Sequence, residues 1–116
     1  GDGLQTRDFT YIDNVIQMNH LAASTEDQGA LNQVYNVACG DRTSLIDLVS
    51  SLQNALSRFD PEIEKVKILH GPTRQGDVKD SLADISKAKT LLGYEPSYKL
   101  NQGIEAAIEW YWKSLR

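Results

Sequence analysis

The chain has 116 residues, of which 41% are hydrophobic and 24% charged, the composition of one ordinary globular domain. Its net charge of −4 argues against electrostatic capture of nucleic acid or of an anionic membrane surface, and no apolar run approaches the roughly 20 residues of a membrane helix. The single cysteine, Cys39, excludes an intramolecular disulfide and favours a reducing, cytoplasmic compartment.

The chain opens on Gly1-Asp2-Gly3, a turn-forming run without an initiating methionine, so we expect the sequence to be a piece of a longer polypeptide. Aromatic and β-branched residues predict a short strand over Asp8–Ile12, with Arg7 at its entrance. A helix is predicted over Asp13–Ser24, because apolar side chains recur there at helical spacing. The buried face that this spacing predicts consists of Ile12, Val15, Ile16, Asn19 and Ala22 or Ala23.

The middle of the chain alternates between predicted strands and a helix. Residues Gln33–Cys39 are almost continuously apolar, which is typical of a strand covered on both faces in an α/β sheet. A helix is predicted to begin at Thr43 and Ser44 and to end at Asp60-Pro61, since a residue before proline avoids the helical region. Alternating residues predict a half-exposed edge strand over Lys65–Leu69.

The last third of the chain contains two predicted helices. Asp84 is expected to cap the first and Gly93 to end it, and a longer helix is predicted over Leu100–Leu115. The order of elements predicts a small α/β unit, close to α+β in type, with helices packed on a short sheet.

Before the first of these helices lies the segment Arg74-Gln75-Gly76-Asp77. Arginine offers a planar fork of donors that matches phosphate, and aspartate accepts hydrogen bonds from hydroxyl groups such as those of a sugar. One arginine near one aspartate is more often a surface ion pair than a site, but a second arginine, Arg7, lies in a motif of its own. There is no glycine-rich dinucleotide fingerprint, Gly-x-Ser-x-Gly elbow or metal-ligand spacing, so serine, cysteine and metal enzymes have little support.

Several motifs follow one another along the chain. They are Gly1-Asp2-Gly3 with Arg7-Asp8-Phe9, Tyr35-Asn36-Val37-Ala38, Arg74-Gln75-Gly76-Asp77, Ser81-Leu82-Ala83-Asp84-Ile85, Leu92-Gly93-Tyr94 and Glu109-Trp110-Tyr111. In order and spacing they resemble the carboxyl-terminal, substrate-binding region of extended short-chain dehydrogenases/reductases, the nucleotide-sugar epimerases and dehydratases. The run from Gln75 to Ile85 is closest to the UDP-N-acetylhexosamine 4-epimerases, the UDP-N-acetylglucosamine enzymes of bacterial surface-polysaccharide synthesis.

The resemblance implies roles for four residues. Arg7 and Arg74 match the two arginines that clamp the substrate diphosphate, where charge-assisted hydrogen bonds are strong. Asp77 matches the acidic residue that helps to position the nucleotide. Ser81 matches a position bordering the sugar pocket, where a serine leaves volume for a 2-acetamido group; an ordinary loop hydroxyl is the alternative. The implied ligand is a UDP-sugar.

The resemblance also shows what this sequence lacks. It has no counterpart of the family's nicotinamide-binding Rossmann half, and none of its tyrosines is followed by lysine at the spacing of the catalytic Tyr-x-x-x-Lys pair. We therefore expect residues 1–116 to be one substrate-binding domain without catalytic or metal-binding residues, inactive alone, with NAD bound outside this chain in the parent enzyme.

Three hypotheses about the function remain open. The leading one is the UDP-N-acetylhexosamine-binding portion of a 4-epimerase, whose partners are a UDP-sugar and the Rossmann half. The second is a stand-alone nucleotide-sugar-binding module that self-associates through the apolar face otherwise packed on that half. The third is the same lobe of a nucleotide-sugar dehydratase or decarboxylase.

Overall fold

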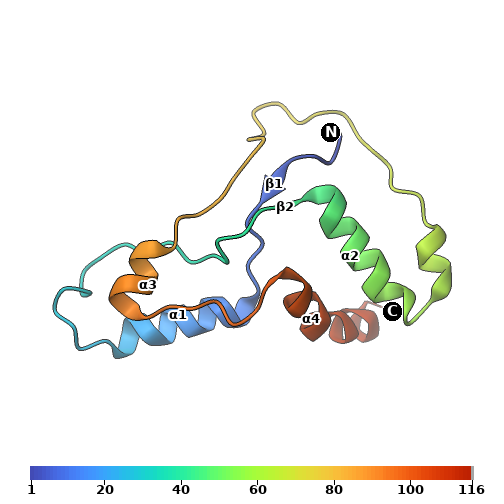
Figure 1. Ribbon diagram of the computed structural model, residues 1–116. Coiled ribbons are helices and arrows are strands. Elements are labelled where there is room, and N and C mark those ends of the chain that lie inside the picture. Colours follow the sequence, from blue (N-terminus) through green and yellow to red (C-terminus); the bar gives the residue numbers. More distant parts are fainter. Residues whose placement is uncertain (116) are drawn as a thin grey trace.

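Helices carry most of the regular structure of residues 1–115, the part of the chain that the computed structural model describes. The elements are, in order, β1 (Thr6–Arg7), α1 (Ile12–Ser24), β2 (Thr43–Ser44), α2 (Leu45–Ser57), the 3-10 helix η1 (Pro61–Lys65), α3 (Ser86–Leu92) and α4 (Leu100–Ser114) (Figure 1). The predicted fold class, helices packed around a short sheet, is confirmed.

The predicted helix ends follow from local chemistry. The Ser44 hydroxyl accepts a hydrogen bond from the Asp47 amide at 3.1 Å and so caps α2. The Asp84 carboxylate accepts one from the Ser86 amide at 2.8 Å at the start of α3. Gly93 ends α3 with φ of 65°, the left-handed conformation that glycine adopts without strain.

The predicted strands are wrong. The sheet consists of β1 and β2, which are antiparallel with Thr6 opposite Ser44, so pairing begins before the predicted strand over Asp8–Ile12. In residues 1–115 neither Gln33–Cys39 nor Lys65–Leu69 forms a strand, and η1 covers the start of the latter. A strand exists only where a neighbouring strand supplies a ladder of backbone hydrogen bonds, and no described strand pairs with either of these two segments.

The predicted buried face of α1 is also wrong. Asn14 is fully buried and Met18 is 3% exposed, whereas Ile12 and Ile16 are 58% and 56% exposed. The helix therefore carries apolar side chains on two sides. The side predicted to face a core is open to solvent in the described structure.

The helices form two groups (Figure 1). Side chains of α1 and α3 enclose the main core, which contains Met18, Ala30, Ala38, Ile85, Ala88, Leu92 and Tyr94. The second group comprises α2, which packs against η1 and α4. None of the described helices is long and apolar enough to cross a membrane.

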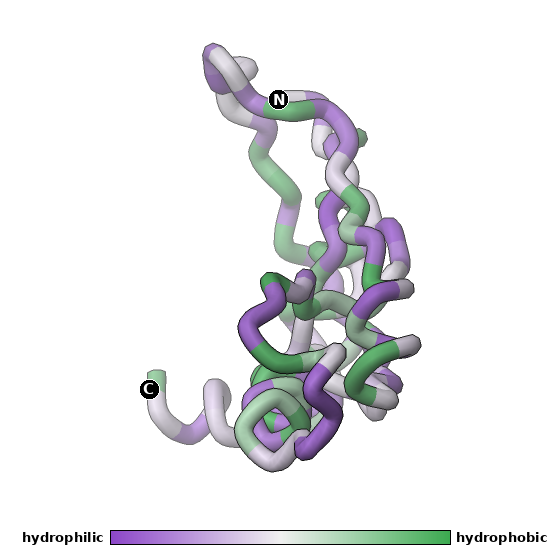
Figure 2. The backbone as a smooth tube through the Cα atoms, turned by 90° about the vertical axis from the view of Figure 1, so that its left-hand side faces the viewer, coloured by the Kyte–Doolittle hydropathy of each residue, from purple (hydrophilic) through white to green (hydrophobic). Residues whose placement is uncertain are grey.

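The molecule is open in shape. Its radius of gyration is 17.2 Å, larger than the about 13 Å expected for a compact domain of this length. Figure 2 shows the N-terminal segment and the loop beside it extending away from the helices. This extended part brings together residues distant in sequence.

Candidate functional site

Residues 70–81, here called the strap, lie beside the N-terminal segment (Figure 1). The Thr6 amide donates to the Lys79 carbonyl at 2.9 Å, and the Ser81 amide donates to the Thr6 carbonyl at 3.2 Å. The Thr6 hydroxyl adds a hydrogen bond to Asp80 Oδ1 at 2.8 Å. These contacts, which span more than 70 residues of sequence, bring the strap beside Arg7.

Arg7 is held in place by partners on both segments. Its Nη2 forms an ion pair with Asp77 Oδ1 at 2.6 Å, and its Nη1 donates to the Thr6 carbonyl at 2.7 Å. The two charged side chains are 30% and 27% exposed. The guanidinium is thus oriented by protein contacts and still reachable from solvent, as an anion-binding group must be.

Arg74 lies in a turn that ends at Asp77. The Asp77 amide donates to the Arg74 carbonyl at 3.3 Å, and Gly76 within the turn has φ of 78°. The Arg74 side chain is exposed and makes no ion pair with any described residue. The structure therefore brings Arg7 and Asp77 together through their side chains, and Arg74 lies in the same turn as Asp77.

A cavity of about 360 Å³ adjoins Arg74 and Asp77, a size within the usual range of small-molecule sites. Apolar side chains from α2 and from the loop before the strap form much of its lining. The lining includes Leu45, Ile46, Val49, Ile68, Leu69 and Pro72, with Gln5 and His70 as further polar residues. A cavity with apolar walls and with the charged residues Arg74 and Asp77 in its lining can hold a flat ring joined to a charged group.

Ser81 lies at the other end of the strap. It is exposed, its backbone is fixed by Thr6, and it does not line the cavity. Along the strap the order is thus the cavity at Gly71-Pro72, then Arg74 and Asp77, then Ser81.

Asp8 is a structural residue that the sequence analysis did not single out. Its two carboxylate oxygens accept hydrogen bonds from the Cys39 and Gly40 amides, each at 2.9 Å. It follows Arg7 directly, so these bonds fix the segment that carries the arginine. The position of Asp8 next to Arg7 in the Arg-Asp-Phe motif is the signal from which this anchor could have been predicted.

The Cys39 thiol beside this anchor is poorly suited to nucleophilic chemistry. Burial, and after it the charge of Asp8, raise the pKa of the Cys39 thiol above its ordinary value. A neutral, buried thiol is a poor nucleophile. The described residues contain no group of three or more histidine, cysteine or acidic side chains that could hold a metal ion.

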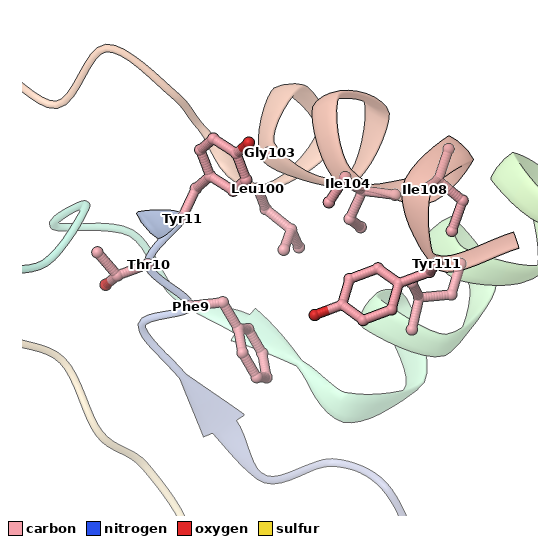
Figure 3. Close-up of a pocket in the computed structure, with 10 residues that line it drawn as sticks. Phe9, Thr10, Tyr11, Leu100, Gly103, Ile104, Ile108 and Tyr111 are labelled. Carbon is pink, nitrogen blue, oxygen red and sulfur yellow. The ribbon is translucent and has the colours of Figure 1, made fainter. Parts of the chain in front are cut away.

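A second, apolar cavity of about 220 Å³ lies between the segment after Arg7 and the helices α2 and α4 (Figure 3). Figure 3 shows Phe9, Tyr11, Leu100, Ile104 and Tyr111 around it. It offers no charged side chain, so it is a less suitable place for a nucleotide sugar than the cavity beside Arg74.

The chain is similar to nucleotide-sugar enzymes along its length. The family described as GDP-mannose 4,6 dehydratase matches residues 1–107. The UDP-glucose 4-epimerase of Thermotoga maritima, solved with UDP-glucose, is 34% identical with a TM-score of 0.83, over 100% of this chain and 34% of that one. The UDP-glucuronic acid 4-epimerase of Bacillus cereus, in complex with UDP-glucuronic acid and NAD, is 35% identical with a TM-score of 0.79, over 100% and 34%.

A third solved structure is that of an enzyme named for an N-acetylated sugar. The UDP-N-acetylglucosamine 4-epimerase of Methanobrevibacter ruminantium, in complex with UDP-N-acetylmuramic acid, is 28% identical with a TM-score of 0.81, over 97% of this chain and 33% of that one. The chain spans about a third of the length of the curated relatives that it matches.

Proposed function

Because the chain belongs to the GDP-mannose 4,6-dehydratase family of nucleotide-sugar epimerases and dehydratases, we propose that it is the UDP-sugar-binding portion of an NAD-dependent 4-epimerase. The ion pair between Arg7 and Asp77, in which Arg7 Nη2 and Asp77 Oδ1 lie 2.6 Å apart, supports this proposal most, because it joins Arg7 to the turn that contains Arg74. Two arginines around one exposed turn suit a diphosphate, which carries more negative charge than one guanidinium can match.

In this proposal Arg7 and Arg74 bind the diphosphate and Asp77 accepts a hydrogen bond from a ribose hydroxyl. Arg7 keeps unused N–H groups beyond those directed at Asp77, Thr6 and Lys79, because a guanidinium has five donors. The Asp77 carboxylate keeps lone pairs in the same way. Both residues can therefore contact a ligand without giving up the ion pair that orients them.

The order along the strap supports one direction for the ligand. The nucleoside lies in the cavity of about 360 Å³, and the sugar lies toward Ser81. The small Ser81 side chain leaves room for a 2-acetamido group, which is why we propose a UDP-N-acetylhexosamine, as in the Methanobrevibacter enzyme. Other relatives are named for UDP-glucose or UDP-glucuronate, so the hexosamine is the part of the proposal that substrate comparison must test.

The residues present do not fit a nicotinamide dinucleotide. The first helix, α1, follows Phe9-Thr10-Tyr11 without the glycine-rich turn on which a dinucleotide diphosphate rests. We propose that NAD is bound by another part of the parent polypeptide, a Rossmann half. The exposed side of α1 is a suitable place for that half to pack, because Ile12 and Ile16 are more than half exposed.

One observation favours a second candidate function. Apolar side chains are also exposed near the C-terminal end of α4, where Trp110 is 63% and Leu115 is 78% exposed. A chain that acts alone would bury them by self-association, as a binding module rather than as part of an enzyme. Size-exclusion chromatography with light scattering tests this: a strictly monomeric chain contradicts it.

Isothermal titration calorimetry with UDP and UDP-N-acetylglucosamine tests the leading proposal. We expect Arg74→Ala to weaken the binding of both at least tenfold, because it removes a charge-assisted contact to the diphosphate. Arg42→Ala is the matched control, since Arg42 is an exposed arginine that does not line the cavity beside Arg74. Equal binding by the Arg74→Ala variant and the wild type would refute the proposed site.

A further inference from the structure

Gln5 is the one residue lining the cavity beside Arg74 whose side chain has a buried oxygen without a partner among the described residues. A buried acceptor that receives no hydrogen bond is unfavourable and uncommon in native structures. The oxygen concerned is Oε1 of the carboxamide. An unpaired polar group in a candidate ligand cavity needs either a structural or a ligand-dependent explanation.

The surroundings of Gln5 offer no structural partner. Its backbone carbonyl is fixed, because it accepts a hydrogen bond from the Leu45 amide at 3.0 Å. Its carboxamide nitrogen lies against Gly1, so close that a Cβ on that glycine would be 2.7 Å away. The residue is therefore held at the cavity by its backbone, and the amide group can reorient by rotation about its last side-chain bond, where rotation is soft.

Two of the other polar side chains that line this cavity are already engaged, and the third, Arg74, is assigned to the diphosphate in the proposed function. Asp77 binds Arg7, and His70 Nδ1 lies 3.0 Å from the Gly1 carbonyl oxygen. The walls of the cavity beside Gln5 are apolar, with Leu45, Ile46 and Val49 of α2 on one side. A flat ring between such walls would leave its polar edge directed at the unpaired Gln5 amide oxygen.

We propose that Gln5 recognises the nucleobase by pairing its carboxamide with the base edge, an inference that rests on the proposed function. A carboxamide presents an acceptor and a donor side by side. Uracil presents the complementary pair, the N3–H donor beside a carbonyl acceptor. Turning the amide toward the base supplies Oε1 with the donor that it lacks, so binding removes an unfavourable feature of the ligand-free protein.

One variant, one control variant and three ligands separate this contact from the rest of the site. The ligands are UDP and N3-methyl-UDP, which lacks the N3–H donor, and inorganic pyrophosphate serves as a probe without a base. The variant is Gln5→Met, which keeps the length of the side chain and removes both hydrogen-bonding groups. Gln28→Met, in an exposed loop, is the matched control.

We expect UDP to bind Gln5→Met at least about tenfold more weakly than wild type, because the variant loses both hydrogen bonds of the pairing. N3-methyl-UDP should bind wild type about tenfold more weakly than UDP and should lose nothing further in the variant. Pyrophosphate should bind both proteins equally. Because the methylated ligand tests the contact in the wild-type protein, the inference stays testable even if the variant does not fold.

The outcomes also separate this inference from the proposed function. If wild type and Gln5→Met bind UDP equally while Arg74→Ala loses binding, the role of Gln5 is wrong and the proposed function stands. If methylation of N3 weakens binding to the variant as much as binding to wild type, the methyl group acts elsewhere and the proposed pairing is wrong. If wild type does not bind UDP, both proposals are wrong.

Discussion

Replacement of Asn14 by alanine should destabilise the fold strongly, because this residue is the fully buried polar link between α1 and the segment before α4. Its Nδ2 donates to the Tyr98 carbonyl at 2.8 Å, its Oδ1 accepts from the Tyr98 amide at 3.1 Å, and Nδ2 also lies 3.5 Å from Cys39 Sγ. Alanine would remove all three contacts and would leave both backbone groups of Tyr98 without these partners.

The magnitude follows from these contacts. Two neutral hydrogen bonds contribute roughly 1 kcal/mol each. Leaving the partly buried Tyr98 amide unpaired costs about 1 kcal/mol more, whereas the Tyr98 carbonyl keeps its contact with Cys39 Sγ at 3.4 Å. We therefore expect the free energy of unfolding to fall by about 3 kcal/mol. At roughly 4 °C per kcal/mol for a domain of this size, the Tm should fall by about 12 °C.

Urea denaturation followed by circular dichroism measures this change. Asn19→Ala is the matched control, because Asn19 is exposed on the same helix and its replacement brings the same gain in helix propensity. If the two variants have free energies of unfolding within about 0.5 kcal/mol of each other, the Tyr98 contacts do not support the fold and the reasoning is wrong.

Two further predictions concern close packing and pH. Gly103→Ala should destabilise the chain by about 1–3 kcal/mol despite its better helix propensity, because its new Cβ would lie 2.8 Å from Tyr11 Cβ, an atom that cannot move without the backbone. The control Ala106→Gly, at an exposed site on α4, should lose only helix propensity, and an unchanged Tm for Gly103→Ala would contradict the close contact. Burial raises the pKa of Tyr94 to about 12, so its contribution to stability should be fully present below pH 10, where the unfolded tyrosine is neutral, and should fall as the pH rises from 10 toward 12. Chemical denaturation over this range should show the decline. The decline should be smaller in Tyr94→Phe, which has no hydroxyl to ionise at this position.

The sequence alone determined the helices, because the signals for a helix lie within a few residues of one another. Ser44 at the start of α2 and Gly93 at the end of α3 act on the nearest turn of backbone, so their effect can be read without knowing the rest of the fold. Motif resemblance likewise identified the family from residues in their order along the chain.

Strand pairing was decided only by the tertiary structure. The apolar run over Gln33–Cys39 has the composition of a buried strand, and it forms none because no described strand pairs with it. In contrast, Thr6 pairs with Ser44 and Asp80, although nothing in its own surroundings predicts either partner. Pairing is a property of two segments, so composition in one of them is insufficient.

The orientation of α1 and the geometry of the site depend on tertiary structure for the same reason. Helical spacing predicts that an apolar stripe exists, but the burial of Asn14 and Met18 instead of Ile12 and Ile16 depends on what packs against the helix. The resemblance picked out Arg7 and Asp77 separately. Their ion pair forms because hydrogen bonds from Thr6 hold the strap beside β1, across a separation of more than 70 residues that no local pattern in the sequence encodes.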